Sequence, residues 1–209
     1  RNAGQCCSGA KRFIVHESIK DEFVTRLIEE RLKTVKEGDL MDLETDFGVL
    51  ISEAAAKEVE QQVQHTIGQG AKLVYGGVRR GAYYMPTVLD NCTKEMDICK
   101  NMEIFGPIFP IFTFQTLDEA IEIAETSDYG LSSGVITNDF QDAMKVAASL
   151  RTGMVAVNGS GGFRAQELPF GGGKKMSGNS RECMSSVLEE VTQEKSIIFR
   201  YAMKKYHES

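Results

Sequence analysis

Ile111-Phe112-Thr113-Phe114 closes a strongly apolar stretch, 104–114, in the middle of the chain. Pro107 and Pro110 disfavour a helix at the start of that stretch, so the apolar run predicts a buried strand. Beyond it, helical and extended patterns alternate: a helix over 117–126, a strand over 134–137, a helix over 140–150 capped by Asn138 or Asp139, and a strand over 153–158. This alternation predicts right-handed crossovers between parallel strands.

The chain before the apolar run shows the same kind of alternation. Apolar residues recur at helical spacing from 19 to 35, and Ser52 is a suitable N-cap for a second helix over 53–68. The expected strands are 11–16, 71–75 and patches within 82–89; a helix over 183–190 and a strand over 196–199 end the chain. We therefore predict an α/β fold with a mostly parallel sheet and flanking helices, in three α/β/α layers.

Composition excludes several classes of protein. The 209 residues carry a net charge of −6, which argues against a nucleic-acid partner. No apolar run approaches the roughly 20 residues that span a bilayer, and no signal-peptide pattern is visible. The five cysteines are irregularly spaced and the three histidines lie far apart, so we expect no metal site and no disulfide framework. A reducing, cytoplasmic location is the expectation.

The first seven residues, Arg1-Asn2-Ala3-Gly4-Gln5-Cys6-Cys7, form a small, polar run that ends in two thiols and precedes a strand. A cysteine in a short turn beside backbone N–H groups is placed where a thiolate can be stabilised and directed. Most cysteines, however, are buried small hydrophobes, so the turn alone identifies only a candidate nucleophile.

Glycines gather at 159–162 and again at 169–173, after the last buried strand pattern. Such loops at the carboxyl ends of strands are where open α/β sheets place their sites. The run before Lys174 and Lys175 is not a phosphate-binding P-loop, because it lacks the Gly-x4-Gly-Lys-Ser/Thr spacing.

Taken in order, three stretches resemble the aldehyde dehydrogenase superfamily, and the resemblance extends to about Phe199. Asn2 to Cys7 resembles its Asn-x-Gly-Gln-x-Cys nucleophile signature. Glu103-Ile104-Phe105-Gly106-Pro107 resembles its Glu-x-Phe-Gly-Pro segment, and 169–182 resembles its Pro-Phe-Gly-Gly-x-Lys-x-Ser-Gly-x-x-Arg-Glu block. The glycine–lysine spacing is one residue longer in this chain, so either Lys174 or Lys175 corresponds to the lysine of the family block. The Met-Ser-Gly that follows Lys175 favours Lys175.

The resemblance implies an NAD(P)-dependent oxidation of a small aldehyde to a carboxylate. Cys7 would be the nucleophile, forming a thiohemiacetal and then a thioester, and Cys6 would be only its neighbour. Glu103 would accept hydrogen bonds from the cofactor ribose and Phe105 would pack beside the nicotinamide. Phe170 and, subject to the extra residue in 163–170, Phe163 would line the aldehyde channel. No metal is implied.

The resemblance also implies a division of the chain. Residues 1–195 would be the catalytic domain, and 196–209 a C-terminal oligomerisation strand and tail that serve a homodimer or homotetramer. The general base, the oxyanion amide and the nucleotide-binding domain of the family lie upstream of the cysteine, so this chain by itself is expected to be inactive.

Two other readings stay open. A coenzyme A-acylating enzyme would pass the acyl group to a thiol, and a structural or interaction domain would keep the fold without turnover. Faster alkylation of Cys7 than of Cys92, Cys99 or Cys183 would argue against the structural reading. Arg164 lies near the expected substrate loop, where it is either a carboxylate-binding group or a solvent-facing side chain.

Overall fold

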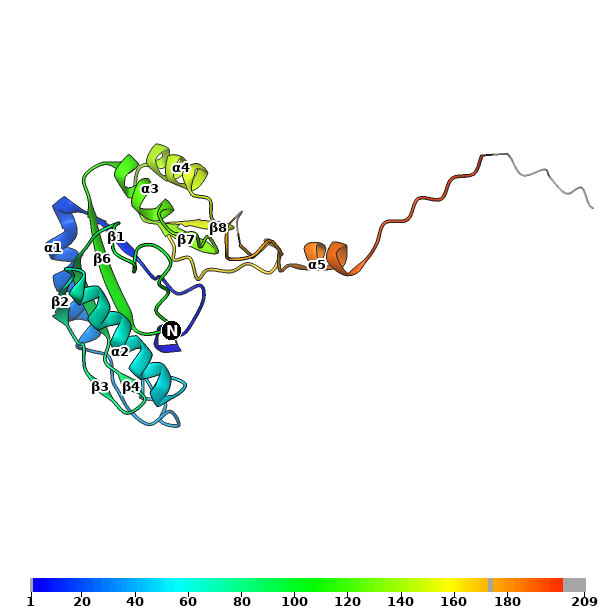
Figure 1. Ribbon diagram of the computed structural model, residues 1–209. Coiled ribbons are helices and arrows are strands. Elements are labelled where there is room, and N and C mark those ends of the chain that lie inside the picture. The colour runs from blue at the N-terminus through cyan, green and yellow to red at the C-terminus, as the bar shows by residue number, and fades with distance from the viewer. Residues whose placement is uncertain (1, 173–174, 201–209) are drawn as a thin grey trace, which may run out of the picture.

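A four-stranded sheet forms the centre of the protein, whose computed structural model describes residues 2–172 and 175–200. Its order is β1 (Phe13–His16), β6 (Ile108–Phe114), β5 (Thr87–Cys92) and β2 (Lys72–Tyr75) (Figure 1). β6 runs parallel to both β1 and β5, whereas β2 runs antiparallel to β5. The predicted mostly parallel α/β sheet is confirmed.

β6 begins at Ile108, three residues before the strand predicted at Ile111-Phe112-Thr113-Phe114, and it includes Pro110, which cannot donate a hydrogen bond to the sheet. The β5 register shifts at the neighbouring position, between Leu89 and Cys92, where Asn91 has a φ of 57°. Leu89 is the register partner of Pro110. The proline is thus accommodated beside a bulge in a central strand.

Helices cover both faces of the sheet. α1 (Glu17–Arg26) and the wider helical turns η2 (Leu27–Leu32) pack against Val88 and Ile111. The next residues along those strands, Leu89 and Phe112, point the other way and pack with α2 (Glu53–Gly68) and α3 (Leu117–Glu125). Alternate strand residues therefore enter two separate cores, which gives the predicted three layers.

The expected helices form, with one difference in length. α2 has the expected bounds, and the Ser52 hydroxyl accepts a hydrogen bond from the Ala55 amide at 3.0 Å. Asp139, rather than Asn138, caps α4 (Phe140–Ser149). The first helix ends at Leu32 instead of 35, because the Lys33 amide bonds five residues back to Ile28 and the turns widen there.

A second, two-stranded parallel sheet pairs β7 (Ser132–Val135) with β8 (Met154–Val157), with α4 as the crossover. The single sheet that we expected is therefore divided into two, and a hairpin of β3 (Arg79–Arg80) and β4 (Tyr83–Tyr84) is separate from both. β7 ends before the predicted Thr137 because the Asn158 side chain accepts the Thr137 amide at 3.0 Å.

The C-terminal region extends away from the sheets (Figure 1). α5 (Met184–Val191) follows the N-cap Cys183, close to the predicted helix. Residues 196–199, expected to be a strand, have no strand partner within the described part of the chain, and their apolar side chains are exposed. An inter-subunit strand remains a prediction here, and 201–209 lie outside the described residues.

Candidate active site

The nucleophile turn is braced by two side chains of its own signature. Asn2, Ala3 and Gly4 all have φ between 50° and 74°, the left-handed region. The Asn2 amide donates to the Gln5 carbonyl at 2.9 Å, and the Gln5 amide donates back to the Asn2 carbonyl at 3.2 Å. The Gln5 side-chain oxygen also accepts the Ile51 amide at 2.9 Å. The asparagine and the glutamine therefore fix the backbone that leads to Cys7.

Position 4 requires glycine for two reasons: its φ is +74°, and the backbone of Gly106 leaves no room for a side chain. A Cβ on Gly4 would lie 2.0 Å from the carbonyl oxygen of Gly106, well inside van der Waals contact. Gly106 in turn lies against the side chain of Val59 in α2. The absence of both side chains lets the nucleophile turn touch the Glu103–Pro107 segment, although about 100 residues separate them in sequence.

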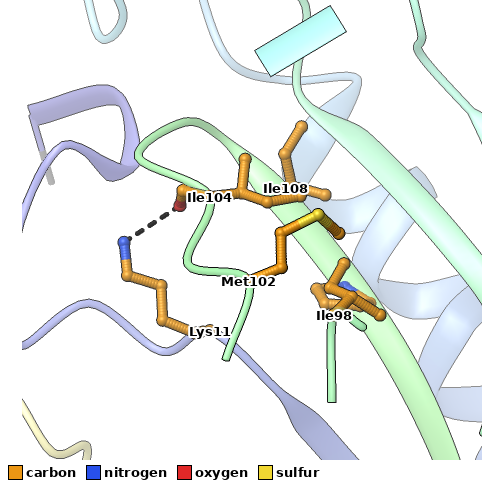
Figure 2. A pocket seen from close by; sticks show the side chains of 6 residues that line it. Lys11, Ile98, Met102, Ile104 and Ile108 are labelled. Atoms are coloured by element: carbon orange, nitrogen blue, oxygen red, sulfur yellow. Dashed lines mark hydrogen bonds between the residues drawn. The ribbon is translucent and has the colours of Figure 1, made fainter. Parts of the chain in front are cut away.

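Lys11 joins the same two segments and was not among the residues predicted from the sequence. Its ammonium donates to the carbonyls of Gly4 and Ile104, each at 3.1 Å. Figure 2 shows the bond to Ile104. It also lies 4.0 Å from the Glu103 carboxylate and 4.2 Å from the centre of the Phe105 ring. Burial lowers the pKa of Lys11, with the Glu103 carboxylate opposing this effect. A lysine four residues after a nucleophile gave no pattern by which to single it out.

The cysteines differ sharply in their surroundings. Cys7 is exposed, whereas the thiol of Cys6 is half-buried and lies 3.3 Å from the Ser8 hydroxyl. Cys92 and Cys99 are buried, and burial raises the pKa of Cys92 to about 12 and also raises that of Cys99. Among these four thiols, Cys7 is the most exposed to a reagent or substrate.

A cavity of about 400 Å³ lies beside the nucleophile turn and brings Cys7 together with Phe170. Its lining residues come from the turn and from the glycine-rich region: Asn2, Gln5, Cys6, Cys7, Ser8, Gly162, Arg164 and Phe170. Phe163 is not among them, and its side chain is 59% exposed. The structure therefore brings one of the two predicted channel aromatics to the thiol and leaves the other in solvent.

The glycine-rich region is fastened to the end of α3 by Lys175. Its ammonium donates to the Ser127 carbonyl at 2.8 Å and pairs with the Glu125 carboxylate at 3.1 Å, with only 6% of the lysine side chain exposed. The Ser177 hydroxyl accepts the Gly130 amide nearby. This anchoring gives Lys175 a structural place within the motif; Lys174 lies outside the described residues.

The residues expected to hold the cofactor present suitable groups. The Glu103 side chain is 35% exposed and offers a carboxylate acceptor, and Phe105 is 43% exposed and offers an aromatic ring. Lys11 holds both next to the nucleophile turn. A carboxylate and a ring at this position fit a ribose and a nicotinamide. In the described ranges, no cluster of three metal-ligating side chains occurs and no helix has the length and apolar character needed to cross a bilayer.

Comparison with known proteins shows the family of this chain. Residues 1–197 match the model of the aldehyde dehydrogenase family, and the chain belongs to that family. It is 41% identical over 197 residues to 3-sulfolactaldehyde dehydrogenase of Priestia aryabhattai, an alignment that covers 94% of this chain and 41% of that protein.

Solved structures with the same fold contain either nicotinamide cofactor. Betaine aldehyde dehydrogenase from Staphylococcus aureus, in complex with NAD+, has a TM-score of 0.89 at 34% identity and covers 100% of this chain and 42% of its own. Glyceraldehyde-3-phosphate dehydrogenase from Methanocaldococcus jannaschii, complexed with NADP, has a TM-score of 0.85 at 38% identity over 90% of this chain and 40% of its own.

The chain thus spans about 41% of the length of the curated relative that it matches. The fold and the family are established for this stretch.

Proposed function

We propose that this chain supplies the nucleophile of an NAD(P)-dependent aldehyde dehydrogenase that converts an aldehyde to a carboxylate. One observation carries the proposal: exposed Cys7 opens into a cavity from a turn that Lys11 ties to Glu103 and Phe105. Packing alone does not require a solvent-open thiol, an exposed carboxylate and an exposed ring to be gathered around one lysine.

Cys7 would act twice. Its thiolate adds to the aldehyde carbon, forming a carbon–sulfur bond and a thiohemiacetal oxyanion, which the backbone N–H of Cys7 would stabilise. NAD or NADP, when bound, supplies the acceptor for the hydride of that carbon. Cys7 then carries the acyl group as a thioester. Water, deprotonated by the general base of the full-length protein, attacks this carbonyl; the carbon–sulfur bond breaks with the Cys7 thiolate as the leaving group, and the carboxylate product and the second proton are released.

The cofactor and substrate groups would be divided between two segments. Glu103 would accept hydrogen bonds from the ribose hydroxyls, and Phe105 would pack beside the nicotinamide. Phe170 would contact the aldehyde, since it lines the cavity of Cys7. The names of the relatives differ in their substrates, so they do not select one for this chain.

The rest of the machinery would come from other parts of the full-length protein. We propose that the general base, the oxyanion amide and the nucleotide-binding domain lie outside these 209 residues, and that 1–195 is the catalytic domain. Residues 196–209 would pair with another subunit in a homodimer or homotetramer. The isolated chain is expected to give no turnover.

Reduction of NAD and of NADP by the full-length protein, followed at 340 nm with a panel of aldehydes, tests the proposal. Cys7→Ala is expected to lower kcat by at least about 10⁴-fold, because the covalent step has no other nucleophile. Cys6→Ala is the matched control and should retain activity within a few fold. Product analysis with and without coenzyme A distinguishes hydrolysis from acyl transfer. Equal losses in the two variants, or turnover by Cys7→Ala, would contradict the assignment.

A further inference from the structure

Resting on the proposed function, we propose that Arg164 forms an anion subsite in the cavity of Cys7. The substrate is then a small aldehyde that carries a carboxylate, sulfonate or phosphate group away from its reacting carbon. The proposal joins three observations: which side chains line the cavity, how the Arg164 guanidinium is held, and which of its hydrogen-bond donors are used.

Arg164 is the one formally charged side chain among the cavity-lining residues, all of which belong to the described part of the chain. The other side chains there are amides, a hydroxyl, two cysteines and an aromatic ring. The cavity volume of about 400 Å³ is at the lower end of the range for small-molecule sites. A small substrate that reaches Cys7 therefore encounters one cationic group.

The guanidinium of Arg164 lies over the aromatic ring of Phe170. Its central carbon lies 4.3 Å from the centre of the Phe170 ring, and Phe170 is only 9% exposed. Phe170 is itself fixed, because its amide and carbonyl exchange hydrogen bonds with the backbone of Glu182. Contact with a fixed ring restricts the arginine side chain, and a guanidinium has five N–H donors that a planar or tetrahedral anion can use.

Glu182 uses only part of that fork. Its carboxylate accepts one hydrogen bond, from Nη2 of Arg164 at 3.1 Å, and this is the single hydrogen bond from the Arg164 guanidinium within the described residues. The two side chains are 49% and 69% exposed, so the pair is solvent-screened and weak. A substrate anion can use the remaining N–H groups, and Glu182 limits how tightly it is held.

Kinetics of the full-length protein test the subsite with matched substrates: 4-oxobutanoate and 3-oxopropane-1-sulfonate against neutral butanal. The measured quantity is the ratio of kcat/KM for an anionic aldehyde to that for butanal, at fixed ionic strength. We expect Arg164→Gln to lower this ratio about 10-fold, Arg164→Lys to lower it less, and Glu182→Gln to raise it, since a charged hydrogen bond is gained or lost. The carboxylate and sulfonate arms show which anion is preferred.

Arg80 provides a matched control. Its guanidinium also lies over an aromatic ring, 4.7 Å from the centre of Tyr83, and pairs with Glu37, but it belongs to the β3–β4 hairpin and not to the cavity lining. Arg80→Gln should leave the ratio unchanged. A ratio that stays constant in all the Arg164 and Glu182 variants, with butanal still oxidised, would overturn the subsite and leave the proposed function intact.

If no aldehyde is oxidised, the proposed function fails and the subsite is decided by binding instead. The rate of Cys7 alkylation by iodoacetamide is measured with butyrate, butane-1-sulfonate or neutral butyramide present. Tandem mass spectrometry assigns the label, because the tryptic peptide from Asn2 to Lys11 holds both Cys6 and Cys7. Protection by the anions that is lost in Arg164→Gln supports the subsite. Equal protection by butyramide, or none by the anions, overturns it.

Discussion

The nucleophile turn and the C-terminal region contain cysteines in opposite structural settings. Around Cys7, the turn makes side-chain bonds within itself and contacts residues some 100 positions away, through Gly4 and Lys11. Around Cys183, the contacts are local: its thiol caps α5 with Ser185 and Ser186 as partners. One cysteine is held by tertiary structure, and the other by the first turn of a single helix.

The apolar side chains of the two regions differ in the same way. Ile104, beside the nucleophile turn, is 5% exposed, whereas large apolar side chains along the C-terminal region are between 43% and 81% exposed: Met184, Val187, Leu188, Val191, Ile197, Ile198 and Phe199. Exposed apolar groups in this number are typical of surfaces that contact other protein. The chain's own packing therefore accounts for the position of Cys7, and it does not account for that of α5.

Gly4→Ala is expected to have the largest effect on the nucleophile turn and on kcat. The new Cβ would be 2.0 Å from the Gly106 carbonyl oxygen at a φ of +74°, which we expect to destabilise the turn by about 2–4 kcal/mol. Displacement of the thiol should lower kcat of the full-length protein about 100-fold. Gly81→Ala, at a φ of +58° with open space around it, isolates the backbone cost and should leave kcat within a few fold. Similar kcat values for the two variants would disprove the contact.

Lys11→Met should weaken the same region less. It leaves the Gly4 and Ile104 carbonyls without their shared donor, which is expected to cost about 1–3 kcal/mol and to lower kcat about 10-fold. The KM for NAD or NADP should rise as well, because Glu103 and Phe105 lose their common neighbour. Lys33→Met, which removes an exposed pair with Glu29, is the control and should change neither constant. An unchanged cofactor KM in Lys11→Met would mean that the two segments are positioned independently.

Alkylation rates compare the cysteines of the two regions in the unsubstituted protein, and the expected differences are the smallest of those predicted. Hydrogen bonds with the Ser185 and Ser186 hydroxyls and from the Ser186 amide lower the pKa of Cys183 to about 7. Its labelling should therefore rise from pH 6 to 8 and then level off, as its thiolate fraction saturates. Buried Cys92, with a pKa of about 12, should stay nearly unlabelled to pH 9.

Ser185→Ala provides the control for that profile, because it removes the largest of these hydrogen bonds and should raise the pKa of Cys183 toward that of an ordinary cysteine. The prediction that Cys7 is alkylated faster than Cys92, Cys99 and Cys183 is therefore kept for the two buried thiols, Cys92 and Cys99. An alkylation profile of Cys183 that does not move in Ser185→Ala would argue against the cap.

The C-terminal region shows that an apolar run alone does not establish a strand. The predicted strand at 196–199 rests on an apolar run, and a run of that kind becomes a strand only when another strand is beside it. In the described chain no such neighbour is present, and Ile198 and Phe199 are each 81% exposed. Its pairing with another subunit stays a prediction.

The direction of β2 could have been predicted from the sequence and was not. Residues 76–86, between β2 and β5, contain no helical pattern, and a parallel connection needs a crossover of a dozen residues or more. A short connection leaves an antiparallel pairing, which the structure has. The alternation of helices and strands predicts a parallel sheet, but it does not predict the direction of the edge strand β2.

The sequence by itself determined the features that depend on neighbouring residues. Short-range patterns predict local structure because the residues that interact lie within a few positions of one another. Examples are the apolar periodicity of the helices, the Ser52 cap, and the spacing of Asn2, Gln5 and Cys7. Only the tertiary structure decided that Gly4 touches Gly106, that Lys11 lies between the nucleophile and cofactor segments, and that Arg164 rather than Phe163 enters the cavity. Those contacts join distant parts of the chain, and packing selects them through shape and burial that no local pattern records.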